Sequence, residues 1–104
     1  MEEKIQCSAI WVDNGNIYPN QPLNITNGFV VCGLRHNNCF GTLSIISNTC
    51  LERVAILNMA VQGFLTSSNR FVDRKEGYSI AFESGQLANR VIQTRGNLHS
   101  EDLW

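Results

Sequence analysis

The chain has 104 residues, which suits one domain and leaves no room for a second. Lysines and arginines number 8 against 9 aspartates and glutamates, so the chain lacks the basic excess typical of proteins that coat long nucleic acids. No run of about 20 apolar residues predicts a membrane span. We therefore expect a single ligand-binding domain over residues 1–104, with no membrane and no polymeric nucleic acid as partner.

The first half of the chain predicts two strands that flank a long loop. Residues 5–12 mix alternation with β-branched and aromatic side chains, which is typical of a strand. Residues 13–16 are a turn signal, and residues 18–27, with two prolines among polar side chains, predict a loop. Residues 28–33 form a short apolar run between glycines, which predicts a buried central strand.

The second half predicts three helices and one more strand. A helix is expected from Cys39 to Ile46, a break at residues 47–49, a buried helix over residues 51–60, a strand over residues 61–66 and a turn at residues 67–69. Asp73 followed by Glu76 predicts a capped helix start, and Gly85 stands where that helix should end. The elements together predict an α+β fold, in which a small antiparallel sheet packs against two or three helices.

Two further features bear on packing. Gly77 lies inside the last predicted helix, where glycine is disfavoured by about 1 kcal/mol. Trp104 follows a polar tail, and we expect it to dock on the core or on a neighbouring subunit rather than extend into water.

The cysteines are expected to be reduced. The chain opens on the charged run Met1 to Lys4 with only a short apolar stretch behind it, so no secretory signal is visible. We therefore expect a cytosolic protein with reduced, buried thiols, namely Cys7, Cys32, Cys39 and Cys50.

A first candidate site follows the strand that ends at Gly33. A polar segment before a helix places side chains and backbone N–H groups where anions bind. Arg35 would grip a phosphate, His36 would stack on a base or donate a hydrogen bond, and Asn37 would contact a base or ribose edge. The alternative is structural: an asparagine caps the helix, His36 lies on the surface and Arg35 pairs with a carboxylate.

The same segment contains Cys32, His36 and Cys39, a set of soft metal ligands. Zinc sites are typically built from closely paired ligands, whereas these cysteines have six residues between them. We expect buried thiols here, with no metal and no cofactor.

A second candidate site spans residues 62–74. Phe64 or Phe71 would stack on a base, while Arg70 and Arg74 would hold phosphates beside Asn69. The alternative is that both phenylalanines belong to the core, that Asp73 only caps the helix and that Arg74 pairs with a glutamate.

Arginine dominates the basic residues, with six of the eight: Arg35, Arg53, Arg70, Arg74, Arg90 and Arg95. A guanidinium matches phosphate in shape and tolerates partial burial. Some of these arginines would serve a small anionic ligand well if they converged, although they can equally be scattered over the surface. Because a domain this small has little core to give up to a pocket, we expect a homo-oligomer with the site between subunits.

Catalysis has little support in the sequence. The chain contains neither a Gly-x-Ser-x-Gly elbow nor a phosphate loop that ends in Gly-Lys-Ser/Thr. A Cys39–His36 couple is conceivable, but helical spacing of three also occurs without catalysis. We expect no enzyme and no catalytic residue.

Four blocks of sequence, at residues 28–39, 62–66, 69–76 and 98–104, resemble the first Thoeris anti-defence family of small phage and prophage proteins. The resemblance implies an oligomeric sponge in the host bacterial cytosol that binds cyclic nucleotide immune signals without cleaving them. The signals are glycocyclic ADP-ribose molecules made by TIR-domain enzymes, and for some members cyclic oligonucleotides made by CBASS cyclases.

By this resemblance Arg35 and His36 form one candidate set, and Arg70, Phe71, Asp73 and Arg74 form another. Asp73 is awkward beside phosphate, and would cap the helix or bond a ribose hydroxyl instead. Two other functions stay open: an inhibitor that contacts a host protein through the 18–27 loop and Trp104, or a small Cys/His hydrolase or metal protein.

Overall fold

The computed structural model describes residues 2–47, 50–88, 90 and 96–104, with side chains omitted for residues 50–54. Its sheet is antiparallel and four-stranded, in the order β2-β1-β3-β4. The strands are β1 (Ile5–Val12), β2 (Phe29–Gly33), β3 (Ala60–Thr66) and β4 (Phe71–Asp73). The helices are α1 (His36–Ile46), α2 (Cys50–Met59), α3 (Arg74–Glu83) and the short 3-10 helix η1 (Ser100–Asp102). The predicted α+β fold is confirmed.

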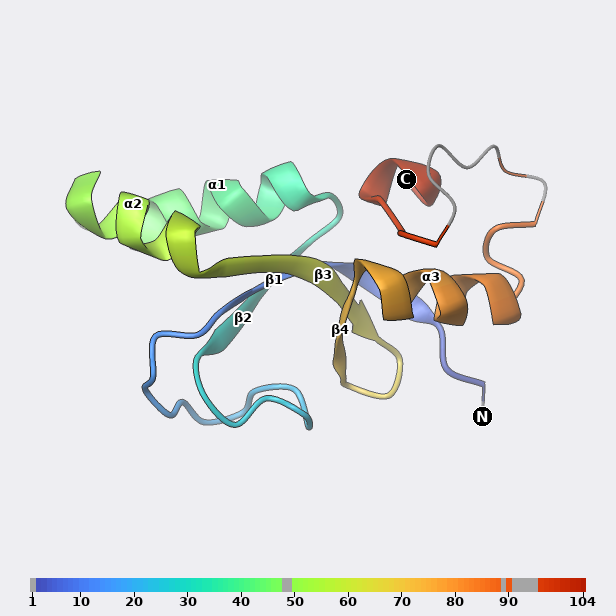
Figure 1. Cartoon of the computed structure of the whole chain (residues 1–104), viewed down its shortest axis with the longest axis horizontal. Helices are drawn as coiled ribbons and strands as arrows, with labels where there is room; N and C mark the ends of the chain where they lie inside the picture. The colour runs from blue at the N-terminus through green and yellow to red at the C-terminus, as the bar shows by residue number, and fades with distance from the viewer. Residues whose placement is uncertain (1, 48–49, 89, 91–95) are drawn as a thin grey trace.

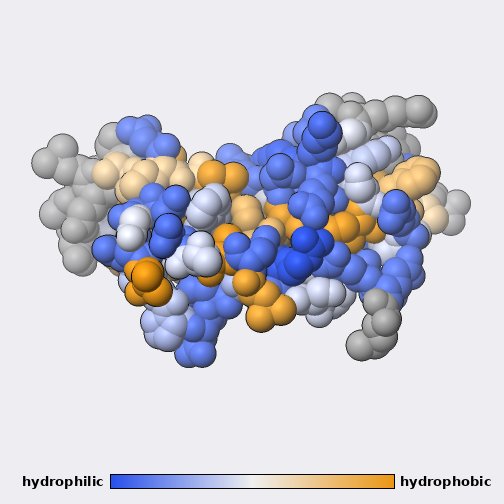
Figure 2. All heavy atoms as spheres, turned by 60° about the horizontal axis from the view of Figure 1, so that its bottom comes forward, coloured by the Kyte–Doolittle hydropathy of each residue, from blue (hydrophilic) through white to orange (hydrophobic). Residues whose placement is uncertain are grey.

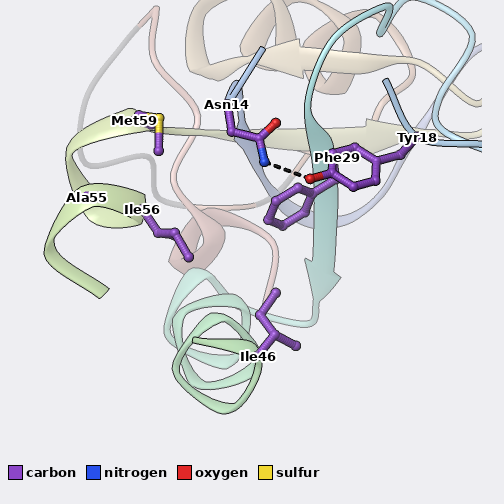
Figure 3. A pocket seen from close by; sticks show the side chains of 7 residues that line it. All are labelled: Asn14, Tyr18, Phe29, Ile46, Ala55, Ile56 and Met59. Carbon is purple, nitrogen blue, oxygen red and sulfur yellow. Dashed lines mark hydrogen bonds between the residues drawn. The ribbon is translucent and has the colours of Figure 1, made fainter. Parts of the chain in front are cut away.

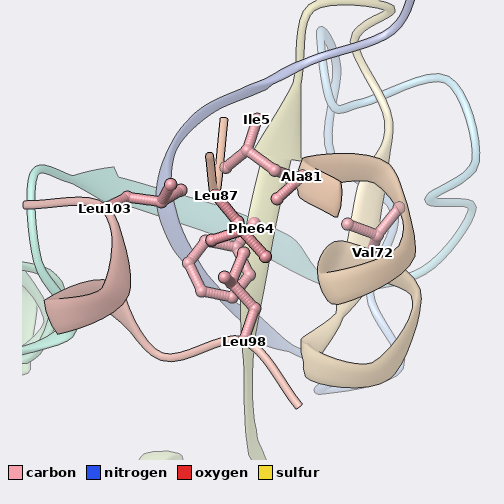
Figure 4. Close-up of a cluster of buried hydrophobic side chains, with 7 residues drawn as sticks. All are labelled: Ile5, Phe64, Val72, Ala81, Leu87, Leu98 and Leu103. Carbon is pink, nitrogen blue, oxygen red and sulfur yellow. The ribbon is translucent and has the colours of Figure 1, made fainter. Parts of the chain in front are cut away.

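The helices cover one face of the sheet, with α1 and α2 at one end and α3 with the C-terminal segment at the other (Figure 1). Two core clusters fill this layer. Under α1 and α2, Ile10 and Val12 of β1 meet Cys39 and Leu43. Under α3, the side chains of Ile5, Val72, Ala81, Leu87, Leu98 and Leu103 surround Phe64 (Figure 4).

The loop between β1 and β2 lies along the other face of the sheet. The Asn24 side chain bonds both backbone groups of Phe71, at 2.6 and 2.8 Å, and the Trp11 indole donates to the Asn27 carbonyl oxygen at 2.8 Å. Figure 2 shows this side of the molecule, where hydrophilic side chains predominate and hydrophobic ones form small groups.

Most predicted elements are confirmed, including the 13–27 connection, the 67–69 turn and the Asp73 cap, whose carboxylate accepts from the Glu76 N–H at 2.8 Å. Gly85 adopts φ +82° one residue beyond Ser84, the residue that follows α3, and the N–H groups of Gly85 and Gln86 bond back to Phe82 and Ala81. This is the predicted glycine cap. Trp104 packs against the core, as one of the two expected alternatives stated.

Three expectations need correction. The strand at 28–33 is not central, because β2 lies at the edge of the sheet and is only partly buried. The helix at 51–60 is not buried over its described side chains, since Ala55, Leu57 and Asn58 are exposed. Helix α1 begins at His36 rather than at Cys39, so the predicted polar segment is partly helical. Residues 48–49 of the predicted break lie outside the described residues.

Gly77 has a packing role that explains its place in α3. A Cβ at this position would lie 3.0 Å from the Phe64 ring and 3.5 Å from the Leu98 side chain. The glycine therefore lets α3 approach the sheet closely, which offsets its low helix propensity.

Candidate functional site

A polar cavity of about 300 Å³ opens where four separate segments meet. It is lined by the start of α1 (Arg35, His36, Asn37), by Gln62 of β3, by Arg74 at the start of α3, and by His99, Ser100 and Glu101. The two predicted clusters thus contribute to one site, through Arg35, His36 and Asn37 from the first and Arg74 from the second.

The two arginines of this cavity differ in their hydrogen-bond partners. Arg74 donates to the Gln62 side-chain oxygen at 2.5 Å and to the Leu98 carbonyl oxygen at 3.3 Å, which are both neutral. Arg35 donates to the main-chain oxygen of Trp104. The contacts of Arg74 hold its guanidinium in place without neutralising its charge, so they leave it able to attract an anion.

His36 forms the floor of the cavity and is buried. Its Nε2 lies 2.8 Å from the Gly63 carbonyl oxygen, and its ring meets Phe64 edge-on at 5.1 Å. Burial lowers the pKa of His36, and the positive charge of Arg74 acts in the same direction, against the Gly63 hydrogen bond. The imidazole is therefore neutral at pH 7, and because a carbonyl only accepts, Nε2 carries its proton.

The C-terminal segment supplies the remaining wall. The Asp102 carboxylate, which is buried, accepts from the His99 backbone N–H at 2.9 Å and lies 3.9 Å from the His99 Nδ1. No described residue accepts a hydrogen bond from that buried Nδ1. Glu101 is exposed at the rim and is the acidic side chain among the lining residues.

The other predicted site residues lie elsewhere. Phe64 is fully buried in the core, and Phe71 is buried against Trp11 on the opposite face of the sheet, with ring centroids 6.2 Å apart. Asn69 adopts φ 58° in the β3–β4 turn, and Asp73 is the α3 cap. Neither phenylalanine offers an open face for stacking, as the structural alternative expected.

Arg70 is committed to carboxylates. It forms a two-pronged contact with Glu3, at 2.8 and 2.9 Å, and reaches Glu76 at 3.2 Å. The pair holds the pKa of Glu3 down at about 2, mainly through the Arg70 hydrogen bonds and then through Thr66. The positive charge of Arg70 is therefore neutralised by carboxylates within the fold.

The remaining arginines do not line the polar cavity over the described residues. Arg90 donates to the Asp102 carbonyl oxygen, and the side chains of Arg53 and Arg95 lie outside the described residues.

Sequence reasoning did not assign His99, Ser100 or Glu101 to the site, and it gave Gln62 no role within the second candidate site. Gln62 stands beside Gly63 in a quoted block, and the others belong to the C-terminal block of the resemblance. No local pattern marks them as ligand contacts, because only the tertiary fold brings the tail beside α1 and α3.

The predicted soft metal ligands Cys32, His36 and Cys39 have separate surroundings. The Cys39 thiol is buried and donates to the Ser8 carbonyl oxygen at 3.6 Å, and burial raises its pKa to about 11. Cys32 is exposed, which corrects the expectation that it is buried, and His36 bonds Gly63. Over the residues that the structure describes, no three His, Cys, Asp or Glu side chains gather as metal ligands. The Cys50 side chain lies outside them.

A second cavity, of about 490 Å³, is apolar and contains none of the predicted site residues. It is lined by Asn14, Tyr18, Phe29, Ile46, Ala55, Ile56 and Met59 (Figure 3). Tyr18 and Phe29 meet edge-on at 5.5 Å, and the Asn14 amide donates to the Tyr18 hydroxyl at 2.7 Å. It lies at the far end of α1, whose 11 residues span roughly 16 Å, and none of the described side chains that line it is charged.

The fold and the polar cavity define a small α+β protein with an arginine-bearing pocket. A scan against protein-family models matches residues 4–104 to the family described as Phage T4 y16D protein, so the chain belongs to this family of phage proteins. Searches of curated proteins and of solved structures each gave no match. Within the described segments, no helix has the length and apolar character needed to cross a membrane.

Proposed function

We propose that this phage protein captures a small phosphate-bearing nucleotide in the polar cavity and holds it without cleaving it. The observation that supports this most directly is the meeting of Arg35 and Arg74, from elements far apart in the chain, at one cavity. The Arg74 guanidinium bonds neutral oxygens, in contrast to that of Arg70, which bonds Glu3 and Glu76. A phosphate would supply the missing negative charge.

The surroundings suit recognition of an anion. Asn37 lies in the first turn of α1, where backbone N–H groups and the helix dipole favour negative charge. The neutral Nδ1 of His36 and the Gln62 side chain add polar contacts for a base or a ribose. Because Gln62, Leu98 and Trp104 already hold the arginines in place, little side-chain entropy remains to be lost on binding.

We further propose that the ligand is a cyclic nucleotide immune signal, of the glycocyclic ADP-ribose type or a cyclic oligonucleotide. The resemblance to Thoeris anti-defence proteins motivates this choice, and membership of a phage family is in keeping with it. Sequestration needs slow release rather than a catalytic group. It would act in the host cytosol, where such a signal would otherwise reach its effector.

Calorimetry against cyclic ADP-ribose isomers and cyclic dinucleotides tests this function. Each arginine makes charge-assisted hydrogen bonds worth about 1.5–3 kcal/mol, so Arg35→Ala and Arg74→Ala should each weaken binding by about 10- to 150-fold. Lys75→Ala, which removes an exposed cation beside Arg74, is the matched control and should bind like the wild type.

The fate of the ligand is then read by heating the complex and separating the released material by chromatography. Intact ligand supports capture, whereas altered ligand would mean an enzyme. If no nucleotide binds, or if both arginine variants bind as tightly as the wild type, the proposal is wrong.

We also propose that the protein acts as a homo-oligomer. Ile45 is 83% exposed and Leu57 is 53% exposed on α1 and α2, although the sequence of α2 is that of a buried helix. A second copy that covers these side chains would account for this difference. Sedimentation equilibrium should show an oligomer that Leu57→Glu shifts towards monomer, while Phe82→Glu, at another exposed hydrophobic position, on α3, leaves it unchanged. A monomeric wild type would contradict the proposal.

One observation favours a second function. In the loop between β1 and β2, Ile17 is 81% exposed and Leu23 is 77% exposed, which suits direct contact with a host protein. If the calorimetry finds no ligand, Ile17→Asp and Leu23→Asp test this function by loss of binding to host protein.

A further inference from the structure

Two cysteines lie side by side on the sheet face opposite α1. Cys32 of β2 pairs in register with Ala9 of β1, and Cys7 stands two residues before Ala9, so Cys7 and Cys32 are diagonal neighbours on one face. At the next position, Gly33, a Cβ would lie on the other face of the sheet, beside Cys39 of α1. Cys32 is exposed, Cys7 is half-buried, and Cys39 is fully buried.

The two thiols influence each other's ionisation across the neighbouring strands. The Cys7 thiol lowers the pKa of Cys32 to about 7, while Cys32 raises the pKa of Cys7. Reactivity of a cysteine follows its thiolate fraction and its exposure, and Cys32 has both. Cys39, by contrast, has neither, since it is buried and its pKa is raised to about 11.

We propose that Cys32 is a reactive thiol that undergoes exchange with low-molecular-weight disulfides, and that Cys7 is the positioning residue that stabilises its thiolate by donating a hydrogen bond. This site uses neither arginine of the polar cavity, so it stands or falls independently of nucleotide capture.

The exchange step is balanced without a further reagent. The Cys32 thiolate attacks one sulfur of a disulfide R–S–S–R, a new Cys32–S–S–R bond forms, and the R–S bond to its former partner sulfur breaks. A leaving alkyl thiolate takes a proton from water, whereas a leaving aromatic thiolate stays ionised at pH 7. Cys32 is oxidised, one half of the small disulfide is reduced, and Cys7 keeps its proton throughout.

The probe for this site is dithionitrobenzoate, an aromatic disulfide whose leaving thiolate absorbs visible light. With the native chain in excess probe, we expect a fast phase with a pH midpoint near 7, lost in Cys32→Ser and kept in Cys39→Ser. Cys7→Ala should raise the midpoint by more than one pH unit towards the ordinary thiol value of about 8.5, and Cys7→Ser, which restores a donor, should bring it part of the way back.

Peptide mapping makes the test independent of the variants. Brief treatment of the wild type with oxidised glutathione at pH 7 should place the first adduct on the peptide that contains Cys32, separate from that of Cys50. The proposal is overturned if the fast phase survives in Cys32→Ser, if the first adduct is on another cysteine, or if Cys7→Ala leaves the midpoint unchanged. Circular dichroism verifies that each variant is folded.

Discussion

Gly63 occupies a point of β3 where no side chain fits. A Cβ there would overlap the Val72 carbonyl oxygen and lie 2.7 Å from the tip of the Phe71 ring. Its own carbonyl oxygen is the acceptor that fixes His36 in the polar cavity. One residue without a side chain therefore permits the β3–β4 pairing and also positions the cavity floor.

Gly63→Ala should reduce the free energy of unfolding by about 2–4 kcal/mol, because the backbone of β4 would have to move to admit the methyl group. Urea denaturation measures this directly. Gly41→Ala is the control, since Gly41 lies in α1 with no atom within 4 Å of its would-be Cβ. That variant should gain up to about 1 kcal/mol from helix propensity. Equal stability of the two variants would contradict the packing argument.

For single residues, the sequence could suggest which residue types form a site, but not which partners each of them contacts in the folded chain. Arg70 and Arg74 stand four residues apart, yet Arg70 bonds Glu3 while Arg74 lines the same cavity as Arg35. The difference depends on contacts with residues about 70 positions away, on which local spacing carries no information. Phe64 shows the same limit, because an aromatic side chain in a predicted strand suits a stacking platform and a core equally well.

The two ends of helix α3 are defined by residues at those ends. Asp73 accepts from the Glu76 N–H at the start, and Gly85 closes the other end with φ +82°. Because these signals are local, both ends could be predicted from the sequence. Burial of α2 and the position of β2 could not, since neighbours distant in the chain decide which strand is central and which helix is covered. Strand β4, with 3 residues, is too short to show a period.

The α3 cap gives a test at the scale of one element. Asp73→Ala removes the acceptor for the Glu76 N–H and should cost about 1 kcal/mol of unfolding free energy, whereas Asp73→Asn keeps a capping oxygen and should cost little. Thermal and urea denaturation measure both. If Asp73→Asn also loses nucleotide affinity at unchanged stability, then Asp73 contacts the ligand, as the resemblance allowed.

The molecule as a whole is tied together by one ion-pair network. Glu3 precedes β1 and accepts hydrogen bonds from Arg70, before β4, and from Thr66 at the end of β3, the latter at 2.6 Å. Arg70 extends the network to Glu76 of α3. The segment before β1 is thereby joined to the β3–β4 turn and to the start of α3 at one point of the surface.

This network predicts how stability depends on pH. The pKa of Glu3 is about 2 in the folded chain, below its ordinary value of 4.5, so its contribution is fully present above pH 4.5 and is lost as the pH falls towards 2. Glu3→Gln should lower the free energy of unfolding at pH 7, by ~1 kcal/mol after allowance for solvent screening, and should match the wild type near pH 2. Exposed Glu2→Gln is the control. A gap between Glu3→Gln and the wild type that is independent of pH would refute the assignment.

The sheet order also has a consequence during synthesis. Strand β1 is made first but lies inside the sheet, and its second neighbour, β3, begins 48 residues after β1 ends, from Val12 to Ala60. At about 5–20 residues per second, translation leaves one edge of β1 unpaired for roughly 2–10 s. A nascent chain that carries Ile10 and Val12 on such an edge is a ready substrate for the host's ribosome-associated chaperones. A phage that depends on this protein early in infection would therefore rely on the folding machinery of the cell that it attacks.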